Sequence, residues 1–231
     1  MEQFLRDGLQ ALNLPQEGVP SLLRFAQELV ETNKVMNLTA ITEPRDIAAL
    51  HFLDSAALLT LTDFKGKSVV DVGTGAGFPG MPLRILEPSI RLTLLDSLNK
   101  RVDFLQRVCD GLALTDVACV HARAEEFAAR HRESFDIATS RAVASLPMLA
   151  ELCLPLVKVG GLFAAMKSVD SDQELEAARK AIGTLGGQVA EVKDYVIPGT
   201  DVRHRVIFVK KVRETPKKYP RTFAKIKKNP L

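Results

Sequence analysis

The strongest constraint on the fold is one junction, where a β-branched run at residues 68–72 leads directly into a glycine-rich loop at residues 73–80. Glycine permits positive φ angles and lets the backbone approach a ligand closely. Beyond this loop, short apolar runs alternate with helical patterns. Such alternation predicts an α/β domain whose parallel sheet has right-handed crossovers.

The strands expected from these runs cover residues 68–72, 91–95, 116–120, 135–139, 161–166, 188–197 and 205–210. The clearest intervening helices cover residues 100–114 and 146–157. The last two strands are separated by a few residues around Pro198 and Gly199. That gap is too short for a helical crossover, so we expect this pair to be antiparallel at the end of a mostly parallel sheet.

Three regions are expected along the chain. Apolar residues recur at helical spacing in residues 1–62, which predicts an N-terminal helical cap. Residues 63–212 hold the alternating pattern. Residues 213–231 are rich in Lys and Pro and are expected to be poorly ordered without a partner.

Composition excludes several classes of protein. The N-terminus lacks the features of a signal peptide and no apolar run is long enough to span a bilayer, so a cytoplasmic protein without membrane contact is expected. Neither the three cysteines nor the histidines have the spacing of metal ligands, and we expect no metal site. Oligomeric state is not readable from the sequence; a monomer is the simplest expectation.

The net charge of +3 hides a strong asymmetry. Residues 203–231 carry 11 Lys and Arg and one acid, whereas the first 202 residues have a net charge of −7. A basic tail on an acidic body indicates a polyanionic partner, most simply a nucleic acid.

The glycine loop predicts an adenosine-containing cofactor. Asp71 ends the first strand, and Gly73, Gly75 and Gly77 follow it. Asp96 ends the second strand, 23 residues past Gly73, where a carboxylate can accept hydrogen bonds from both ribose hydroxyls.

Two cofactor types fit these glycines. Residues 73–77 suit S-adenosylmethionine, whereas Gly75, Gly77 and Gly80 match the dinucleotide fingerprint. A pyrophosphate needs free N–H groups at the start of the next helix, and Pro79 and Pro82 remove two of them. The prolines favour S-adenosylmethionine, whose amino-acid end Asp71 can meet, and leave the dinucleotide open.

Three further residues are candidates for the same pocket. Ala124 and Glu125 follow the third strand, where they can bind the adenine through backbone or side chain. Glu125 is equally interpretable as a first-turn acid favoured by the helix dipole. Phe78 follows the glycines and can pack on the ligand or in the core.

Several motifs in order resemble one known family. They are Asn37-Leu38-Thr39, His51-x-x-Asp54-Ser55, the loop from Asp71 to Gly80, Leu94-Leu95-Asp96-Ser97 with Lys100-Arg101, Arg123-Ala124-Glu125, Thr139-Ser140-Arg141-Ala142, Arg203-His204 and Tyr219-Pro220-Arg221. From about residue 33 onward the chain resembles the bacterial 16S ribosomal RNA guanine-N7 methyltransferase G family, also called glucose-inhibited division protein B.

The resemblance implies a Rossmann-like methyltransferase fold with a helical cap, S-adenosylmethionine as donor and 16S ribosomal RNA or the small ribosomal subunit as partner. It also implies that Gly73, Phe78, Ala124, Glu125 and Arg141 bind the cofactor. The ending at residues 222–230 departs from the family's usual glycine- and proline-containing ending, so no contact is carried over to the last ten residues.

The chemistry of such a reaction agrees with the residues. Guanine N7 has a lone pair and no proton, so its methylation needs positioning more than a general base. Arg141 lies where cofactor and base should meet, and we expect it to orient the methionine carboxylate or to donate to guanine O6. His51 and Asp54 are three residues apart on one helix and can shape the acceptor side or simply pack together.

The basic tail is interpreted as an arm that clamps RNA, with Arg203, Lys217, Lys218, Tyr219 and Arg221 as contacts and Tyr219 stacking on a base. A solubilising tail is the alternative. On the first interpretation, truncation after Thr215 should weaken RNA binding and leave cofactor affinity unchanged. Two other functions stay open: a nucleotide-dependent oxidoreductase, which the tail disfavours, and a non-catalytic RNA-binding assembly factor.

Overall fold

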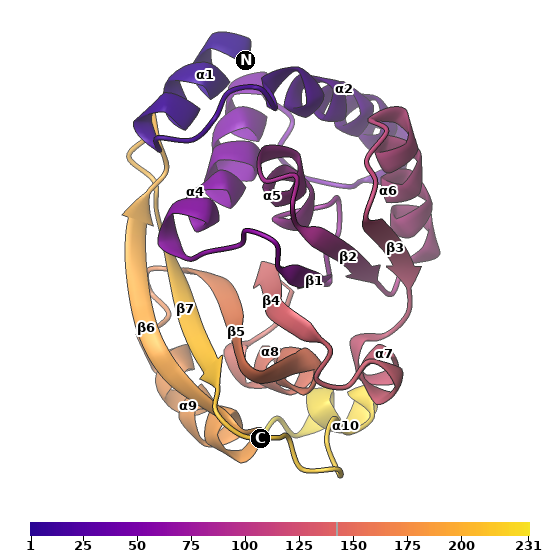
Figure 1. Ribbon diagram of the computed structural model, residues 1–231, viewed down its shortest axis with the longest axis vertical. Coiled ribbons are helices and arrows are strands. Elements are labelled where there is room, and N and C mark those ends of the chain that lie inside the picture. The colour runs from indigo at the N-terminus through magenta and orange to yellow at the C-terminus, as the bar shows by residue number, and fades with distance from the viewer. Residues whose placement is uncertain (142) are drawn as a thin grey trace.

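The computed structural model describes residues 1–141 and 143–231; Ala142, the last residue of the motif at 139–142, lies outside the described residues. A seven-stranded sheet forms the centre of the molecule, with the strand order β3-β2-β1-β4-β5-β7-β6 (Figure 1). Its strands are β1 (Ser68–Val72), β2 (Arg91–Asp96), β3 (Val117–His121), β4 (Phe135–Arg141), β5 (Val157–Ser168), β6 (Gly187–Val196) and β7 (Arg203–Lys211).

The direction of the strands follows from the length of the connections. Helices separate β1 to β5, and each of these strands pairs parallel with its neighbours in that group. The turn between β6 and β7 spans only residues 197–202, and β7 runs antiparallel to both β6 and β5. The expected mostly parallel sheet with an antiparallel end is confirmed.

Helices cover the sheet in two layers (Figure 1). One layer holds α1 (Glu2–Ala11), α2 (Val19–Met36), α3 (Pro44–Asp46), the π-helix η1 (Ile47–Leu53), α4 (Asp54–Leu61), α5 (Gly80–Leu86) and α6 (Asn99–Gly111). The other holds α7 (Ala124–Arg130), α8 (Leu146–Cys153), the 3-10 helix η2 (Leu154–Leu156), α9 (Asp172–Thr184) and α10 (Phe223–Lys228).

Each layer buries its own hydrophobic core against the sheet. Val69 of β1 joins the core that contains Phe25 of α2 and Phe52 of η1. Val70, which points to the opposite face because side chains alternate along a strand, joins the core under α8 and α9. The N-terminal helices therefore share a continuous core with the sheet.

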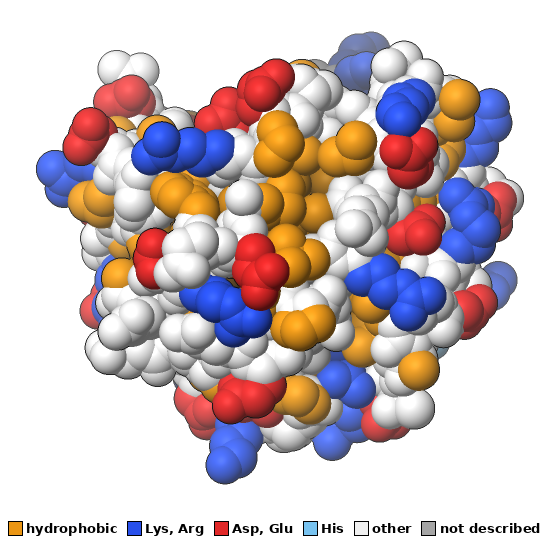
Figure 2. Space-filling view, turned by 90° about the horizontal axis from the view of Figure 1, so that it is seen from above, with side chains coloured by type: hydrophobic (Ala, Val, Ile, Leu, Met, Phe, Trp, Pro, Cys, Tyr) orange, Lys and Arg blue, Asp and Glu red, His pale blue; other side chains and the backbone are white. Residues whose placement is uncertain are grey.

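The outer face of the cap carries an apolar area. Figure 2, which looks onto the side of α1 and α2, shows hydrophobic side chains gathered near the middle of this face with charged side chains around them.

The C-terminal segment differs from its expectation. Residues 213–231 pack against the helical layer that contains α7 and α8, and they include α10 (Figure 1). Tyr219 is 8% exposed and Ile226 is fully buried. The expectation of a poorly ordered tail is wrong, because apolar residues spaced along the segment anchor it to the body despite its many lysines.

Candidate functional site

The glycine loop joins β1 to α5 at the carboxyl edge of the parallel strands. The N–H groups of Gly73 and Thr74 donate to the Leu95 carbonyl oxygen at 2.8 and 3.1 Å, which fastens the loop to β2. Gly75 has a φ of +60°. A Cβ atom on it would meet nothing closer than the Gly73 carbonyl oxygen at 4.0 Å. Gly75 thus presents bare backbone to open space, as the close approach of a ligand requires.

Asp71 organises this loop from inside the protein. Its side chain is fully buried. One carboxylate oxygen accepts from the Thr74 hydroxyl at 2.7 Å and from the Gly80 N–H at 2.9 Å. Burial raises the pKa of Asp71 to about 6. The other carboxylate oxygen lies 3.4 Å from the Thr139 hydroxyl of β4, so both oxygens face the interior of the protein. These contacts give Asp71 a role in shaping the loop, and its direct contact with the cofactor stays a prediction.

The same contact bears on the choice of cofactor. The Gly80 N–H opens α5, where a dinucleotide pyrophosphate would need a free donor. Here the carboxylate of Asp71 takes that donor. The free N–H group at the start of α5 is therefore already bound by an acidic side chain of the protein itself. Like Pro79 and Pro82, this contact disfavours a dinucleotide.

Gly77 and Phe78 have different roles within the loop. Gly77 has a φ of +101°, which other residues rarely adopt, and a Cβ atom on it would lie 2.8 Å from the side chains of Leu105 and Met81. Glycine therefore suits this position for backbone and packing reasons, and Gly77 is not among the residues that line the hollow. Phe78 does line the hollow. Its ring stacks on His51 at 4.4 Å and on Phe25 at 5.3 Å between centroids, so it serves both the pocket and the core.

Asp96 lies at the end of β2, as predicted. One of its carboxylate oxygens accepts from the Gly75 N–H at 2.9 Å and the other from the Leu98 N–H at 2.9 Å. The guanidinium of Arg101 lies 3.5 Å away. These donors fix a carboxylate at the wall of the hollow, in the position where the hydroxyls of a ribose need an acceptor.

Two hollows meet at Gly73, Asp96, Ser97 and Val143, which line both. The first, of about 340 Å³, is further lined by Thr39, His51, Thr74, Gly75, Phe78 and Arg141, among others. The second, of about 130 Å³, is further lined by Ala122, Arg123, Ala124, Glu125 and Phe223, among others. An elongated ligand with a polar end and a flat apolar end fits this pair, and S-adenosylmethionine has that form. The predicted residues Gly73, Gly75, Phe78, Asp96, Ala124, Glu125 and Arg141 thus line one composite site.

Arg141 extends from the end of β4 toward the cap. One terminal nitrogen donates to the Leu50 carbonyl at 2.8 Å and to the Asp54 carboxylate at 2.9 Å, and the other donates to Nδ1 of His51 at 3.0 Å. A guanidinium has five N–H donors. Two of the five have no partner among the described residues, so Arg141 can hold the cap and still donate into the hollow that it lines.

The contact with Arg141 defines the tautomer of His51. Because a guanidinium only donates, Nδ1 of His51 must accept, and the proton sits on Nε2. Nε2 lies 2.8 Å from the Thr39 hydroxyl oxygen. That oxygen also accepts from the Ile41 N–H at 3.0 Å. Burial and the charge of Arg141 lower the pKa of His51 to about 3, so the ring is neutral near physiological pH.

Asp54 completes the network from the other side. It is fully buried. Besides Arg141, it accepts from the Tyr195 hydroxyl at 2.6 Å and from Nδ1 of His204 at 2.8 Å. Burial acts to raise the pKa of Asp54, but the hydrogen bond from His204 and the charge of Arg141 hold it below its ordinary value. His51 and Asp54 are thus joined through Arg141, and the cap, β4, β6 and β7 meet at this point.

Sequence reasoning missed part of this network. Tyr195 belongs to none of the motifs and lies on the edge strand β6, 141 positions along the chain from its partner Asp54. Thr39 and His204 each belong to a short motif of the resemblance, which was the available signal. Neither motif indicates which side chains they contact.

The predicted RNA contacts divide into two groups. Arg203, Lys217 and Lys218 are exposed, as an RNA-binding role requires. Tyr219 is buried, so its ring is not free to stack on a base, and that prediction is wrong. Arg221 binds the fully buried Glu151 through its backbone N–H at 2.8 Å and its guanidinium at 2.6 Å, so it anchors the segment to the body, and its contact with RNA stays a prediction.

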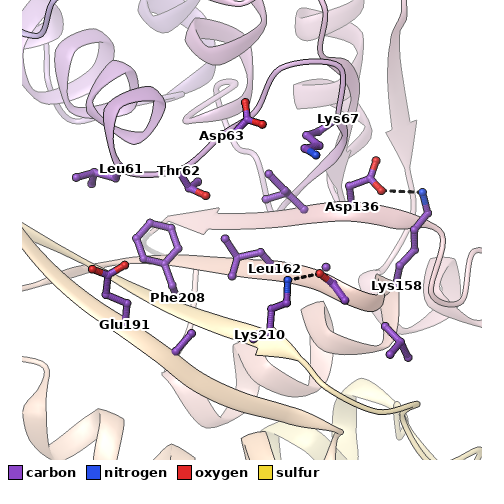
Figure 3. A pocket seen from close by; sticks show the side chains of 15 residues that line it. Leu61, Thr62, Asp63, Lys67, Asp136, Lys158, Leu162, Glu191, Phe208 and Lys210 are labelled. Atoms are coloured by element: carbon purple, nitrogen blue, oxygen red, sulfur yellow. Dashed lines mark hydrogen bonds and ion pairs between the residues drawn. The ribbon is translucent and has the colours of Figure 1, made fainter.

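A further hollow of about 540 Å³ lies near the amino ends of β4 and β5, at the end of these strands away from the candidate site (Figure 3). It is lined by the first residues of β4 and β5 and the last of β7. Lys158 there pairs with Asp136 at 2.9 Å, and Lys210 donates to the Gly160 carbonyl. Ligands of open α/β sheets bind at the carboxyl ends of the strands, so this hollow is not the candidate site.

Solved structures share the fold at low sequence identity. An O-methyltransferase from Bacillus cereus in complex with SAH aligns with a TM-score of 0.58 and 18% identity, over 81% of this chain and 91% of that one. M. jannaschii TYW2 in complex with AdoMet aligns with a TM-score of 0.55 and 13% identity, over 68% of this chain and 73% of that one. These similarities show a Rossmann-like methyltransferase fold.

A family model described as rRNA small subunit methyltransferase G (GidB) matches residues 19–204. The chain belongs to this family. A ribosomal RNA small subunit methyltransferase G from Acetivibrio thermocellus is 46% identical, over 95% of this chain and 91% of that protein. One from Alkaliphilus metalliredigens is 45% identical, over 100% of this chain and 98% of that protein. The family resemblance proposed from the motifs is confirmed.

Within residues 1–141 and 143–231, no helix has the length and apolar character needed to cross a membrane.

Proposed function

We propose that this chain transfers a methyl group from S-adenosylmethionine to N7 of a guanine in 16S ribosomal RNA. The observation that carries the proposal is the composite site at the carboxyl ends of β1, β2 and β4. Three features meet there: bare glycine backbone, the fixed carboxylate of Asp96, and the guanidinium of Arg141 with two of its N–H groups unpartnered among the described residues. The chain is a member of the rRNA small subunit methyltransferase G family.

The two hollows suggest how the residues divide the work. Asp96 accepts hydrogen bonds from the ribose, and Gly73 and Gly75 give the amino-acid end room beside the backbone. Ala124 and Glu125 face the adenine side. When bound, S-adenosylmethionine supplies a methyl group on a sulfonium, which makes it strongly electrophilic.

The residues on the acceptor side need only to position the base. Guanine N7 carries a lone pair and no proton, so no residue has to remove one. His51 is neutral and both of its nitrogens are engaged, which agrees with a role in holding Arg141. The free N–H groups of Arg141 can donate to guanine O6 or to the methionine carboxylate, and this positioning is its proposed role.

The exposed basic residues are the proposed contacts to RNA phosphates. Arg203 lies at the start of β7, and Lys217 and Lys218 lie in the turn before α10. The same segment exposes Lys225, Lys227 and Lys228 on α10. We propose that these side chains attract 16S ribosomal RNA or the small ribosomal subunit in the cytoplasm, with the enzyme acting as a monomer.

The experiment that tests this function is transfer of a labelled methyl group to small subunits from cells that lack the modification. The RNA is then digested and its nucleosides are separated. We expect label in 7-methylguanosine only. Label in another nucleoside would refute the N7 assignment, and RNA binding without any label would support a non-catalytic assembly factor.

A further inference from the structure

The C-terminal segment is fastened to the body by polar contacts as well as by its apolar residues. Arg132 donates to the Tyr219 carbonyl at 2.8 Å and to the Thr215 carbonyl. The ion pair between Arg221 and the buried Glu151 adds a second anchor at 2.6 Å. The chain between these anchors and α10 therefore has a defined position on the body.

This docking brings Phe223, the first residue of α10, to the cofactor site. Phe223 lines the smaller hollow together with Ala124, Glu125 and Asp96. The guanidinium of Arg123 lies over its ring, 4.9 Å from the centroid. The ring is thus held in place from one side at the hollow that we assign to the adenine.

We propose that Phe223 forms the outer wall of the adenine side of the cofactor pocket, so that the C-terminal segment is a cofactor-binding element. This inference rests on the proposed function, because it takes the smaller hollow as the adenine side. Nucleic-acid bases stack favourably on aromatic side chains. The expectation that truncation after Thr215 leaves cofactor affinity unchanged does not fit this placement.

The inference separates two roles within one short segment. Phe223 is directed to the pocket, whereas Lys227 and Lys228, one turn further along α10, are exposed. Changing Phe223 should therefore act on cofactor binding, and changing the lysines should act on RNA binding.

Calorimetry with S-adenosylhomocysteine tests the inference without any catalytic readout. We expect Phe223→Ala to raise the dissociation constant about tenfold, which corresponds to about 1.4 kcal/mol. Phe223→Tyr, which keeps the ring, should bind as wild type does. A second ligand, 5′-methylthioadenosine, has the adenosine but not the amino-acid end, and its affinity should fall by the same factor.

The matched control is Phe4→Ala. Phe4 also lies under a guanidinium, that of Arg45 at 5.1 Å, but it belongs to α1 and lines neither hollow. Phe4→Ala and Lys227→Ala should leave both dissociation constants unchanged. If Phe223→Ala binds S-adenosylhomocysteine as tightly as wild type, the inference is overturned and the proposed function stands. If wild type itself does not bind this ligand, the cofactor assignment fails as well.

Discussion

Replacing Asp54 by Asn tests whether the cap and the sheet are joined through a buried ionic network. Asn has nearly the same size as Asp but no charge. It can still accept from Tyr195 and His204 with its amide oxygen, while its amide nitrogen meets Arg141, which only donates. The largely buried guanidinium of Arg141 then loses its carboxylate partner.

The expected cost follows from burial. Asp54 is fully buried and the Arg141 side chain is 15% exposed. Removing one partner from a buried ion pair costs about 3 to 5 kcal/mol. The lower end applies because Arg141 keeps its bonds to Leu50 and His51. A loss of about 3 kcal/mol lowers the melting temperature of a chain of this size by about 6 to 12 °C.

The pH dependence of the loss can be worked out from the two titrating partners. The pKa of Asp54 is lowered from 3.8, so its contribution is present above pH 3.8 and is lost as the pH falls further. The hydrogen bond to Asp54 raises the pKa of His204 above 6.5, so its contribution is full below 6.5 and is lost as the pH rises through the higher value. The difference between wild type and Asp54→Asn should be largest between these limits.

Urea unfolding at pH 6, followed by circular dichroism, measures the difference in free energy of unfolding. The control is Glu176→Gln, whose ion pair with Arg179 has side chains 74% and 55% exposed and should cost at most about 1 kcal/mol. If Asp54→Asn costs no more than Glu176→Gln, the network does not stabilise the joint between cap and sheet, and the reasoning is refuted.

Four further changes have defined outcomes. Gly75→Leu should abolish binding of S-adenosylmethionine in calorimetry while leaving the melting temperature within a few degrees of wild type, because the added side chain enters the hollow; binding that survives would contradict the site. Arg141→Lys should lower turnover about tenfold or more in a methyl-transfer assay, since an ammonium cannot donate in the directions of Leu50, Asp54 and His51 at once; an unchanged rate makes Arg141 a bystander. The raised pKa of Asp71, about 6 instead of 3.8, means that its stabilisation is full below pH 3.8 and is lost as the pH rises through about 6. Asp71→Asn should therefore gain stability relative to wild type between pH 4 and 8, by at most about 3 kcal/mol in urea unfolding, and a difference that does not vary with pH would count against this. Replacing the exposed lysines of the tail by Ala should flatten the dependence of RNA affinity on salt, because fewer counterions are released, and an equally steep dependence would place the RNA elsewhere; those lysines are Lys217, Lys218, Lys225, Lys227 and Lys228.

Local pattern accounted for the sheet and the loop. The strands were recognisable because a β-branched run and the length of the connection that follows it depend on backbone geometry within a few residues. The antiparallel end followed from the length of one turn. The glycine loop and Asp96 were found because a ligand needs bare backbone and an acceptor at set points on successive strands.

Contacts between distant residues were not recognisable in the same way. Asp71 was assigned to the ligand because it precedes the glycines, but its carboxylate turns inward to Thr74 and Gly80. The tail was expected to be solvated because of its charge. Its anchor, Glu151, lies 70 residues earlier on α8, and composition says nothing about such a partner.

The most direct test of the whole account is to map the methyl group on the RNA. After reaction with the purified enzyme, borohydride reduction and aniline cleave the chain at 7-methylguanosine, and primer extension locates the break. The account predicts a single break at one guanine of 16S ribosomal RNA, with wild type and not with Gly75→Leu. Methylation without any break, or breaks scattered over many guanines, would contradict a site built to position one N7 atom.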